Sequence, residues 1–367
     1  MENKAKVESN VKRGSMWRLS VSTKLLIAFL ALGIIPMSAI AYYNLTRSRD
    51  TVVKLAKENL VELSRSTGDL IDQLIKENQR ISATLANDPL IVTFLAANKK
   101  DRQTMTSKVY KTLRVYAKTH PEDYSPCLLD ANGVVVAAMD DILVGKNRSL
   151  RDYFKVAIQG KPFVSDILVE DATKRPGVLF THPVVSSEEE IVGISLIWLK
   201  ADTIWKIIDD VSVGKQGVAY LVDQDGVIIA HSHRDLLYRS LGKLAPEAVS
   251  TISSTIRFGT IKSAKSPVIP KSLGLDQLSD QVTMARGSGY YRFYSPLDNR
   301  YHVVGYTPLK IQSWTVVVDL PEAQFLAPIK RIRTVAWGSA GLVAVITFII
   351  SILLVRGIVR PIRHLTD

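Results

Sequence analysis

The chain has 367 residues, of which 47% are hydrophobic and 22% are charged, and its formal net charge at pH 7 is +12. This hydrophobic fraction excludes a disordered chain, and at about 100–200 residues per domain the length indicates about two structural units. The single cysteine, Cys127, excludes a disulfide framework and a cysteine-rich zinc site. Because the longest apolar runs form only two blocks, the composition also excludes a polytopic transporter.

Two runs without any charged residue lie near the ends of the chain, at 25–42 and 334–355. At about 1.5 Å per residue each is long enough for the ~30 Å hydrocarbon core of a bilayer, so we expect transmembrane helices at 25–43 and 334–355. The alternative for the first run is a cleaved signal peptide. Its apolar stretch is longer than the ~7–15 residues usual for a signal peptide, which favours an anchor that is not cleaved.

The charges that flank the two runs set the expected orientation. Lysine and arginine outnumber acidic residues in the N-terminal segment 1–24 and again after the second run. Segments rich in lysine and arginine next to a membrane span stay in the cytoplasm, so we expect both ends of the chain there. Residues 44–333 are then expected on the extracytoplasmic side. The net charge therefore belongs partly to the membrane flanks and does not indicate a nucleic-acid partner.

A long amphipathic helix is expected directly after the first run, within residues 44–99. Pro89 marks a break in it. The spacing predicts that this helix packs against the elements that follow, or partly against a second copy of the chain. The predicted apolar stripe consists of Leu63, Thr67, Leu70, Leu74, Ile81 and Leu85.

The region between the two apolar runs contains a repeat. The segment 128–137, LLDANGVVVA, recurs as 221–230, LVDQDGVIIA, with five identities in ten positions. Each copy predicts strand, tight turn, strand, because Asn132-Gly133 and Asp225-Gly226 are dipeptides that accept positive φ. A second pair of strand–turn–strand segments, at 182–193 and 295–305, follows in the same order. Two copies in one order favour two tandem α+β lobes.

The long helix, the two aspartate-containing hairpins and the segment 150–166, LRDYFKVAIQGKPFVSD, together resemble the double Cache family of bacterial extracytoplasmic sensors. The resemblance covers roughly residues 44–325. The last residues, 360–367, look like the start of a HAMP linker, which follows the final membrane helix in such receptors. A chain that ends one turn into this linker favours an output module beyond residue 367.

The resemblance implies an α+β fold: a long N-terminal helix with two tandem PAS-like antiparallel-sheet lobes, flanked by two transmembrane helices. We expect a membrane-distal lobe at 100–209, a membrane-proximal lobe at 210–330 and the HAMP linker from 356. The family usually binds its ligand in the distal lobe. The implied location is the bacterial inner membrane.

Arg151, Tyr153 and Phe154 are the densest candidates for ligand contacts. A guanidinium matches a carboxylate, and two aromatic rings can wall an apolar pocket. The amino-acid-sensing members of the family use a similar Arg-x-aromatic-aromatic run, with tryptophan where Tyr153 stands. Those members also carry an acidic residue five positions after the glycine of the last hairpin, where this chain has Trp198. The alternative for Arg151 is a structural arginine that binds a backbone carbonyl.

Three further residues complete the expected site. Asp171 follows the strand that begins at Phe163 and supplies negative charge, while Tyr110 and Arg114 lie on the helix that enters the distal lobe and cap the pocket. Ordinary amphipathic packing is the alternative for Tyr110 and Arg114.

The sequence therefore predicts a transmembrane signal-transduction receptor that binds a small, anionic, carboxylate-type or amino-acid-like metabolite and moves a helix toward a HAMP module. A homodimer paired through the long helix is the expected working unit. We expect no enzyme activity in this region, no cofactor and no bound metal, since no catalytic or metal-binding signature occurs. The alternative is a membrane-anchored module that docks a periplasmic protein.

Overall fold

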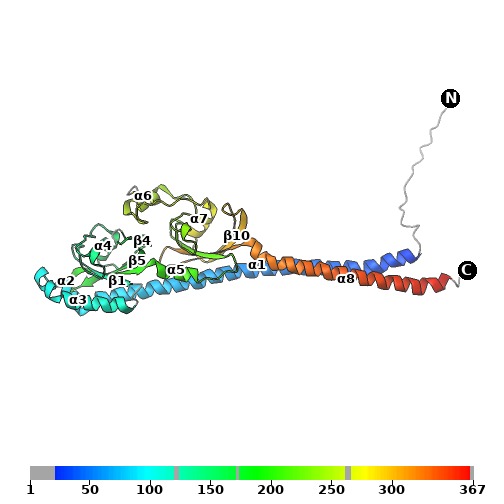
Figure 1. The fold of residues 1–367 in the computed structure, drawn as a ribbon, viewed down its shortest axis with the longest axis horizontal. Coiled ribbons are helices and arrows are strands. Elements are labelled where there is room, and N and C mark those ends of the chain that lie inside the picture. Colours follow the sequence, from blue (N-terminus) through cyan, green and yellow to red (C-terminus); the bar gives the residue numbers. More distant parts are fainter. Residues whose placement is uncertain (1–20, 120–123, 171–172, 261–265, 364–367) are drawn as a thin grey trace, which may run out of the picture. The chain divides into compact units, whose positions relative to one another are not determined.

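A computed structural model of the protein describes residues 21–119, 124–170, 173–260 and 266–363. The chain divides into two compact units, one formed by Leu55–Gln324 and the other by the two ends of the chain, Met1–Lys54 and Phe325–Asp367. Both β-sheets belong to the unit Leu55–Gln324 (Figure 1).

Three helices open the chain: α1 (Val21–Ala86), α2 (Pro89–Ala96) and α3 (Lys99–Thr119). The break between α1 and α2 falls at Pro89, as the sequence predicts. Asp88 caps α2 by accepting a hydrogen bond from the backbone N–H of Leu90, and Pro89 occupies the first turn, where its missing N–H costs nothing. The expected long N-terminal helix is confirmed.

The face of α1 that packs against the sheets differs from the predicted stripe. Thr67 and Leu85 are buried as predicted, but Leu70 is 55% exposed. Small and polar residues replace the expected leucines on the packing face because the backbone of α1 closely approaches that of the strand containing Gly305. A Cβ on Gly305 would overlap the backbone of Leu60. The buried residues of this face are Leu60, Ser64, Thr67, Ile71, Ile75, Asn78, Ser82 and Leu85.

The first lobe contains a sheet in the order β2-β1-β6-β5-β3, with β4 also paired to β5, and every pairing is antiparallel. Its outer layer is α1, whose Ser82 hydroxyl donates to the carbonyl of Phe180 at 3.2 Å. The elements are β1 (Tyr124–Asp130), β2 (Val135–Ala138), η2 (Asp141–Leu143), α4 (Asp152–Ala157), β3 (Phe163–Val164), β4 (Leu168–Val169), β5 (Pro176–Val185) and β6 (Ile191–Lys200).

The second lobe follows α5 (Ala201–Asp209) and contains the antiparallel sheet β8-β7-β11-β10-β9. It also packs on α1: the carboxylate of Asp72 accepts hydrogen bonds from the backbone N–H groups of Lys310 at 3.0 Å and Ile311 at 3.1 Å. The elements are β7 (Val218–Val222), β8 (Ile228–His231), η3 (Arg234–Leu236), α6 (Pro246–Thr255), α7 (Asp276–Thr283), β9 (Gly289–Ser295), β10 (Arg300–Pro308) and β11 (Thr315–Pro321).

The repeat predicted from the two hairpins is confirmed in detail. Asp130 accepts hydrogen bonds from the N–H groups of residues 132 and 134, and Asp223 accepts the corresponding bonds from residues 225 and 227. Both turn glycines have positive φ, +78° at Gly133 and +76° at Gly226. The two lobes are therefore copies of one unit. Over this hairpin, residue n of the first lobe corresponds to residue n + 93 of the second.

The second pair of strand–turn–strand segments predicted from the sequence does form hairpins, but the two hairpins do not occupy equivalent positions in the two lobes. The segment 182–193 spans the hairpin β5–β6, whereas 295–305 spans β9–β10. The order of the sheets places β5 and β6 at the positions of β10 and β11. A short strand–turn–strand pattern does not identify a particular hairpin within a sheet, so the match in order was not a match in position.

In the other unit, the first part of α1 packs beside α8 (Glu322–Arg363), since a Cβ on Gly33 would lie 2.9 Å from Cγ2 of Thr347. Within the part of the chain that the structure describes, no helix has both the length and the apolar composition that a membrane crossing requires.

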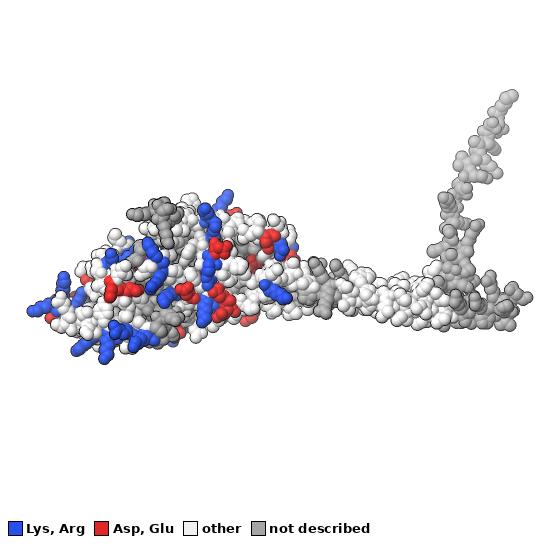
Figure 2. Space-filling model, viewed as in Figure 1, with Lys and Arg blue, Asp and Glu red and all other residues white. Residues whose placement is uncertain are grey.

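The surface of the lobes carries both signs of charge. Figure 2 shows lysine and arginine intermingled with aspartate and glutamate over most of the visible face, with an excess of basic residues around α3. Arg114 is exposed and belongs to this basic part of α3.

Candidate functional site

One face of the first-lobe sheet borders a narrow cavity with a volume of about 50 Å³. Alternate residues of β1 and β6 point into it, because successive side chains of a strand lie on opposite faces. Its lining combines apolar side chains with five charged ones. The lining consists of Ser125, Cys127, Leu129, Val135, Asp140, Leu143, Arg148, Tyr153, Glu170, Thr173, Arg175, Leu179, Leu196, Trp198 and Lys200.

Two of the charged residues in the lining of this cavity form an ion pair. An Nη atom of Arg148 lies 2.5 Å from Oε1 of Glu170, and the two side chains are only 13% and 12% exposed. A buried pair is costly to desolvate and is a weak source of stability. The pair therefore needs an explanation other than holding the fold together.

The β1–β2 hairpin fixes Arg148 at this position. The backbone N–H of Arg148 donates to the carbonyl of Gly133 at 2.7 Å. Gly133 is required there, because its φ is +78° and a Cβ would lie 2.7 Å from the backbone nitrogen of Ser149. The turn predicted from Asn132-Gly133 thus holds the backbone of Arg148 in place.

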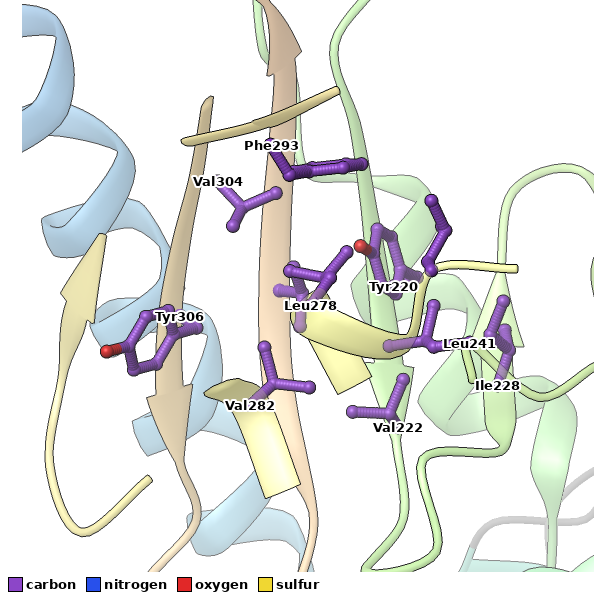
Figure 3. Close-up of a cluster of buried hydrophobic side chains, with 11 residues drawn as sticks. Tyr220, Val222, Ile228, Leu241, Leu278, Val282, Phe293, Val304 and Tyr306 are labelled. Carbon is purple, nitrogen blue, oxygen red and sulfur yellow. The ribbon is translucent and has the colours of Figure 1, made fainter. Parts of the chain in front are cut away.

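The second lobe has a leucine at the equivalent position. Leu241 donates its N–H to the carbonyl of Gly226 at 2.9 Å, as Arg148 does to Gly133. Leu241 is 1% exposed and belongs to a packed apolar cluster that fills the corresponding face of the second sheet (Figure 3). The cluster consists of Tyr220, Val222, Ile228, Leu241, Leu275, Leu278, Val282, Phe293, Val304, Tyr306 and Val317. Apolar side chains therefore fill this position of the unit in the second lobe, whereas the first lobe has an arginine beside a cavity there.

Two weakly acidic groups of the cavity stay protonated at neutral pH. Burial raises the pKa of the Cys127 thiol to about 12, and Arg148 offsets this only in part. Burial also raises the pKa of the Tyr153 hydroxyl well above its ordinary value. Cys127 is therefore not a thiolate nucleophile, and Tyr153 offers a neutral hydroxyl.

Of the three residues expected to form the core of the site, only Tyr153 lines this narrow cavity, although Arg151 and Tyr153 together line a second, larger cavity between the lobes. Tyr153 lines the cavity, while Phe154 is 5% exposed and packs in the apolar core of the first lobe. An Nη atom of Arg151 donates to the carbonyl of Thr255 in the second lobe at 3.3 Å. This contact matches the alternative of a structural arginine bound to a backbone carbonyl.

The remaining expected residues lie elsewhere or outside the described residues. The lining of the cavity includes neither Tyr110 nor Arg114. Both lie on α3, where Tyr110 is half-buried and Arg114 is exposed. Asp171 lies outside the described residues. Trp198 does line the cavity, so the position counted from Gly193 faces the expected space, and its side chain is an indole rather than an acid.

Sequence reasoning missed Arg148 and Glu170. Arg148 could have been found by extending the repeat, because the sequence places a charged residue in one copy where the other has Leu241. Glu170 lies 22 residues further along, and no periodic pattern marks it.

A second, larger cavity of about 480 Å³ lies between the lobes, and its lining includes Arg151, Tyr153, Glu170 and Arg257. Arg257 contacts three carboxylates, with nitrogen–oxygen distances of 2.9 Å to Asp223, 3.3 Å to Asp166 and 3.5 Å to Asp225. Burial raises the pKa of Asp223 to about 7, although the charge of Arg257 lowers it. This junction ties the first lobe to the hairpin turn of the second.

The segment around β4 makes further contacts at this junction. Asp166 accepts from the indole N–H of Trp314 at 2.8 Å and from the side-chain amide of Gln224 at 3.2 Å. The backbone N–H of Val169 donates to the carbonyl of Arg257 at 2.9 Å. Across the described ranges 21–119, 124–170, 173–260 and 266–363, no group of three or more His, Cys, Asp or Glu side chains is placed to hold a metal ion.

Comparison with known proteins identifies relatives of this arrangement. Residues 48–329 match the family described as Cache domain. The methyl-accepting chemotaxis protein McpG of Pseudomonas putida is 25% identical over 233 residues, which cover 62% of this chain and 34% of that protein. The chain thus spans about a third of the length of the curated relative that it matches.

Two solved structures share the fold at low sequence identity. The sensor domain of the V. cholerae histidine kinase DctB has a TM-score of 0.56 and 18% identity, covering 72% of this chain and 98% of that chain. The ligand-binding domain of the Campylobacter jejuni chemoreceptor Tlp3, solved in complex with 4-methylisoleucine, has a TM-score of 0.51 and 13% identity, covering 75% of this chain and 94% of that chain.

Proposed function

The chain belongs to the Cache domain family, and from this premise we propose that it is the sensory region of a transmembrane receptor for a small anionic metabolite. The ligand occupies the narrow cavity of the first lobe. The observation that carries the proposal is the contrast between Arg148 beside that cavity and Leu241 in the filled second lobe. Glu170 compensates the charge of this arginine inside the protein, but the planar guanidinium beside a cavity also suits an external carboxylate, and its presence in only one copy favours an anion-binding role.

The chemistry of the lining supports a carboxylate or an amino-acid-like anion. The Arg148 guanidinium offers a planar pair of donors that suits a carboxylate, and the Tyr153 hydroxyl and Trp198 ring flank it with one donor and an apolar wall. Asp140 supplies the negative charge that an ammonium group would need. The Tlp3 domain was solved with an amino-acid-type ligand, which supports a ligand of this size class.

The site residues proposed from the sequence take different roles in this account. Tyr153 contacts the ligand, Phe154 supports the wall from the core, and Arg151 binds the second lobe through Thr255. Tyr110 and Arg114, on the helix that enters the lobe, remain candidates for ligand contacts. Asp171, in the loop after β4, remains a third.

We propose the two-pass arrangement expected from the sequence for the whole chain. The uncharged runs 25–43 and 334–355 cross the bacterial inner membrane, and residues 1–24 and the start of the HAMP linker at 356–367 are cytoplasmic. The extracytoplasmic part consists of the helix 44–99, a membrane-distal lobe at 100–209 and a membrane-proximal lobe at 210–330. Ligand binding shifts the helix that leads to the output module.

A homodimer is the proposed working unit. The predicted leucine stripe of α1 does not form the main packing face against the sheets, and Leu70 within it is 55% exposed. Leu63, Leu74 and Ile81 lie on the same side of the helix and are half-buried. A second copy of α1 would cover this side.

The second candidate function is the docking of a periplasmic protein without a small molecule. The small volume of the first-lobe cavity, about 50 Å³, favours it. The two readings differ in one experiment, a thermal-shift screen of the full chain with small carboxylates. A receptor gains melting temperature with one compound of the panel and loses that gain in Arg148→Leu. A docking module shows no shift with any of them.

A further inference from the structure

The Arg148–Glu170 pair occupies the part of the cavity where a ligand carboxylate would bind. Both side chains line the cavity, and the 2.5 Å contact between them takes up a donor of the guanidinium. The second lobe closes the same unit with Leu241 in place of the arginine. The contact between a guanidinium and an internal carboxylate has the same chemistry as the contact between that guanidinium and a bound carboxylate.

We propose that Glu170 is a built-in occupant of the ligand's carboxylate position, and that a small monocarboxylate displaces it from Arg148. This inference rests on the proposed function and names the regulation of that same site. The exchange conserves charge at the guanidinium, since one carboxylate replaces another. Two further cationic side chains line the cavity, Arg175 and Lys200, and can receive the displaced Glu170. Withdrawal of the Glu170 side chain also enlarges a cavity that is otherwise too small for most metabolites.

The position of Glu170 connects this exchange to the second lobe. The preceding residue, Val169, donates its N–H to the carbonyl of Arg257, and Asp166 of the same segment binds Trp314. Glu170 therefore stands at the end of the segment that joins the lobes. A ligand that displaces Glu170 from Arg148 changes the forces on this segment without touching the second lobe. The ligand therefore binds the state with Glu170 released more tightly than the state with Glu170 bound to Arg148.

The test is calorimetric titration of the full chain in detergent with acetate and with propionate, using propionamide as the uncharged control. Glu170→Gln keeps the shape of the side chain and removes the competing charge. If Glu170 occupies Arg148 in nine of ten molecules, its removal tightens binding about tenfold. Glu170→Asp, which is shorter by one methylene, gives an intermediate gain and serves as a second variant in case Glu170→Gln folds poorly. Glu322→Gln alters an exposed arginine pair, Arg292–Glu322, and is the matched control without effect.

The outcomes separate this inference from the proposed function. Tighter propionate binding in Glu170→Gln and Glu170→Asp, no binding of propionamide and loss of binding in Arg148→Leu support the built-in occupant. Binding that depends on Arg148 but is unchanged or weaker in both Glu170 variants overturns it and leaves the proposed function standing. Carboxylate binding in the Glu170 variants that is indifferent to Arg148→Leu, or no binding in any variant, overturns both.

Discussion

Arg148 and Leu241 occupy the same position in the two copies of one structural unit, and each donates its backbone N–H to the carbonyl of the turn glycine. The backbone geometry is shared, so the difference between the lobes lies in the side chains. Leu241 completes an apolar cluster, whereas Arg148 pairs with Glu170 in the lining of a cavity. One copy of the unit is a packed support, and the other has the features of a binding site.

The first prediction concerns the stability cost of this ion pair. Arg148→Leu alone removes one side of this buried ion pair and lowers the free energy of unfolding by up to about 3–5 kcal/mol. The double variant Arg148→Leu, Glu170→Leu imitates the second lobe and recovers this loss, to within about 1 kcal/mol of the parent or above it. Urea unfolding measures both. A double variant as unstable as the single one would show that the pair supports the fold.

Two turn glycines of the first lobe give a matched pair of substitutions. A Cβ on Gly133 would lie 2.7 Å from the backbone of Ser149, whereas a Cβ on Gly145 meets nothing within 4 Å, and both residues have φ near +80°. Gly145→Ala should cost only about 1–2 kcal/mol, the strain of a left-handed alanine. Gly133→Ala adds the overlap and should cost more, and it should also weaken ligand binding by displacing Arg148. Equal losses of stability in the two variants would contradict the role assigned to Gly133.

The third prediction concerns pH and the strands that lead to α8. Nδ1 of His302 lies 2.7 Å from Asp319, and Nε2 lies 3.0 Å from Asp298. Burial lowers the pKa of His302, but the hydrogen bonds and charges of the two carboxylates raise it further, to about 9 against an ordinary 6.5. The folded state therefore binds a proton more tightly than the unfolded state.

The sign of the effect follows from this difference. The contribution of His302 is complete below about pH 6.5 and is lost as the pH rises through about 9, with a magnitude of a few kcal/mol at most. The free energy of unfolding of the parent chain should fall across this interval, and that of His302→Asn should be flatter. A parent and a variant with parallel pH profiles would show that Asp298 and Asp319 do not raise the pKa of His302.

The fourth prediction tests the proposed dimer. Leu70→Glu places a charge on the exposed leucine side of α1 and should shift the chain from dimer to monomer in analytical ultracentrifugation. Gln79→Glu adds the same charge nine residues further along, on the opposite side of the helix, and should leave the dimer intact. Dissociation in both variants, or in neither, would exclude this side of α1 as the dimer contact.

Local signals in the sequence predicted much of the fold. The hairpins at Gly133 and Gly226 could be located because a tight turn with positive φ requires particular residues. The break at Pro89 follows from the missing N–H of proline. The resemblance to a known family then supplied the order of the lobes, which no local pattern contains.

The packing face of α1 and the site could not be found in this way. Periodicity favours large apolar residues, but the sheets approach α1 so closely that Ser64 and Ser82 lie in the interface. The proposed site depends on the meeting of Arg148 and Glu170, which belong to different segments and are brought together only by the folded lobe. Arg151 fits the family pattern, yet its side chain binds Thr255 across the junction.

A crystal structure of the chain grown with propionate tests the central claim most directly. The account predicts density for the carboxylate on the Arg148 guanidinium, with Glu170 turned away toward Arg175 or Lys200 and the second-lobe cluster around Leu241 unchanged. An intact Arg148–Glu170 contact with the anion bound elsewhere, or with no anion in the first lobe, would contradict it.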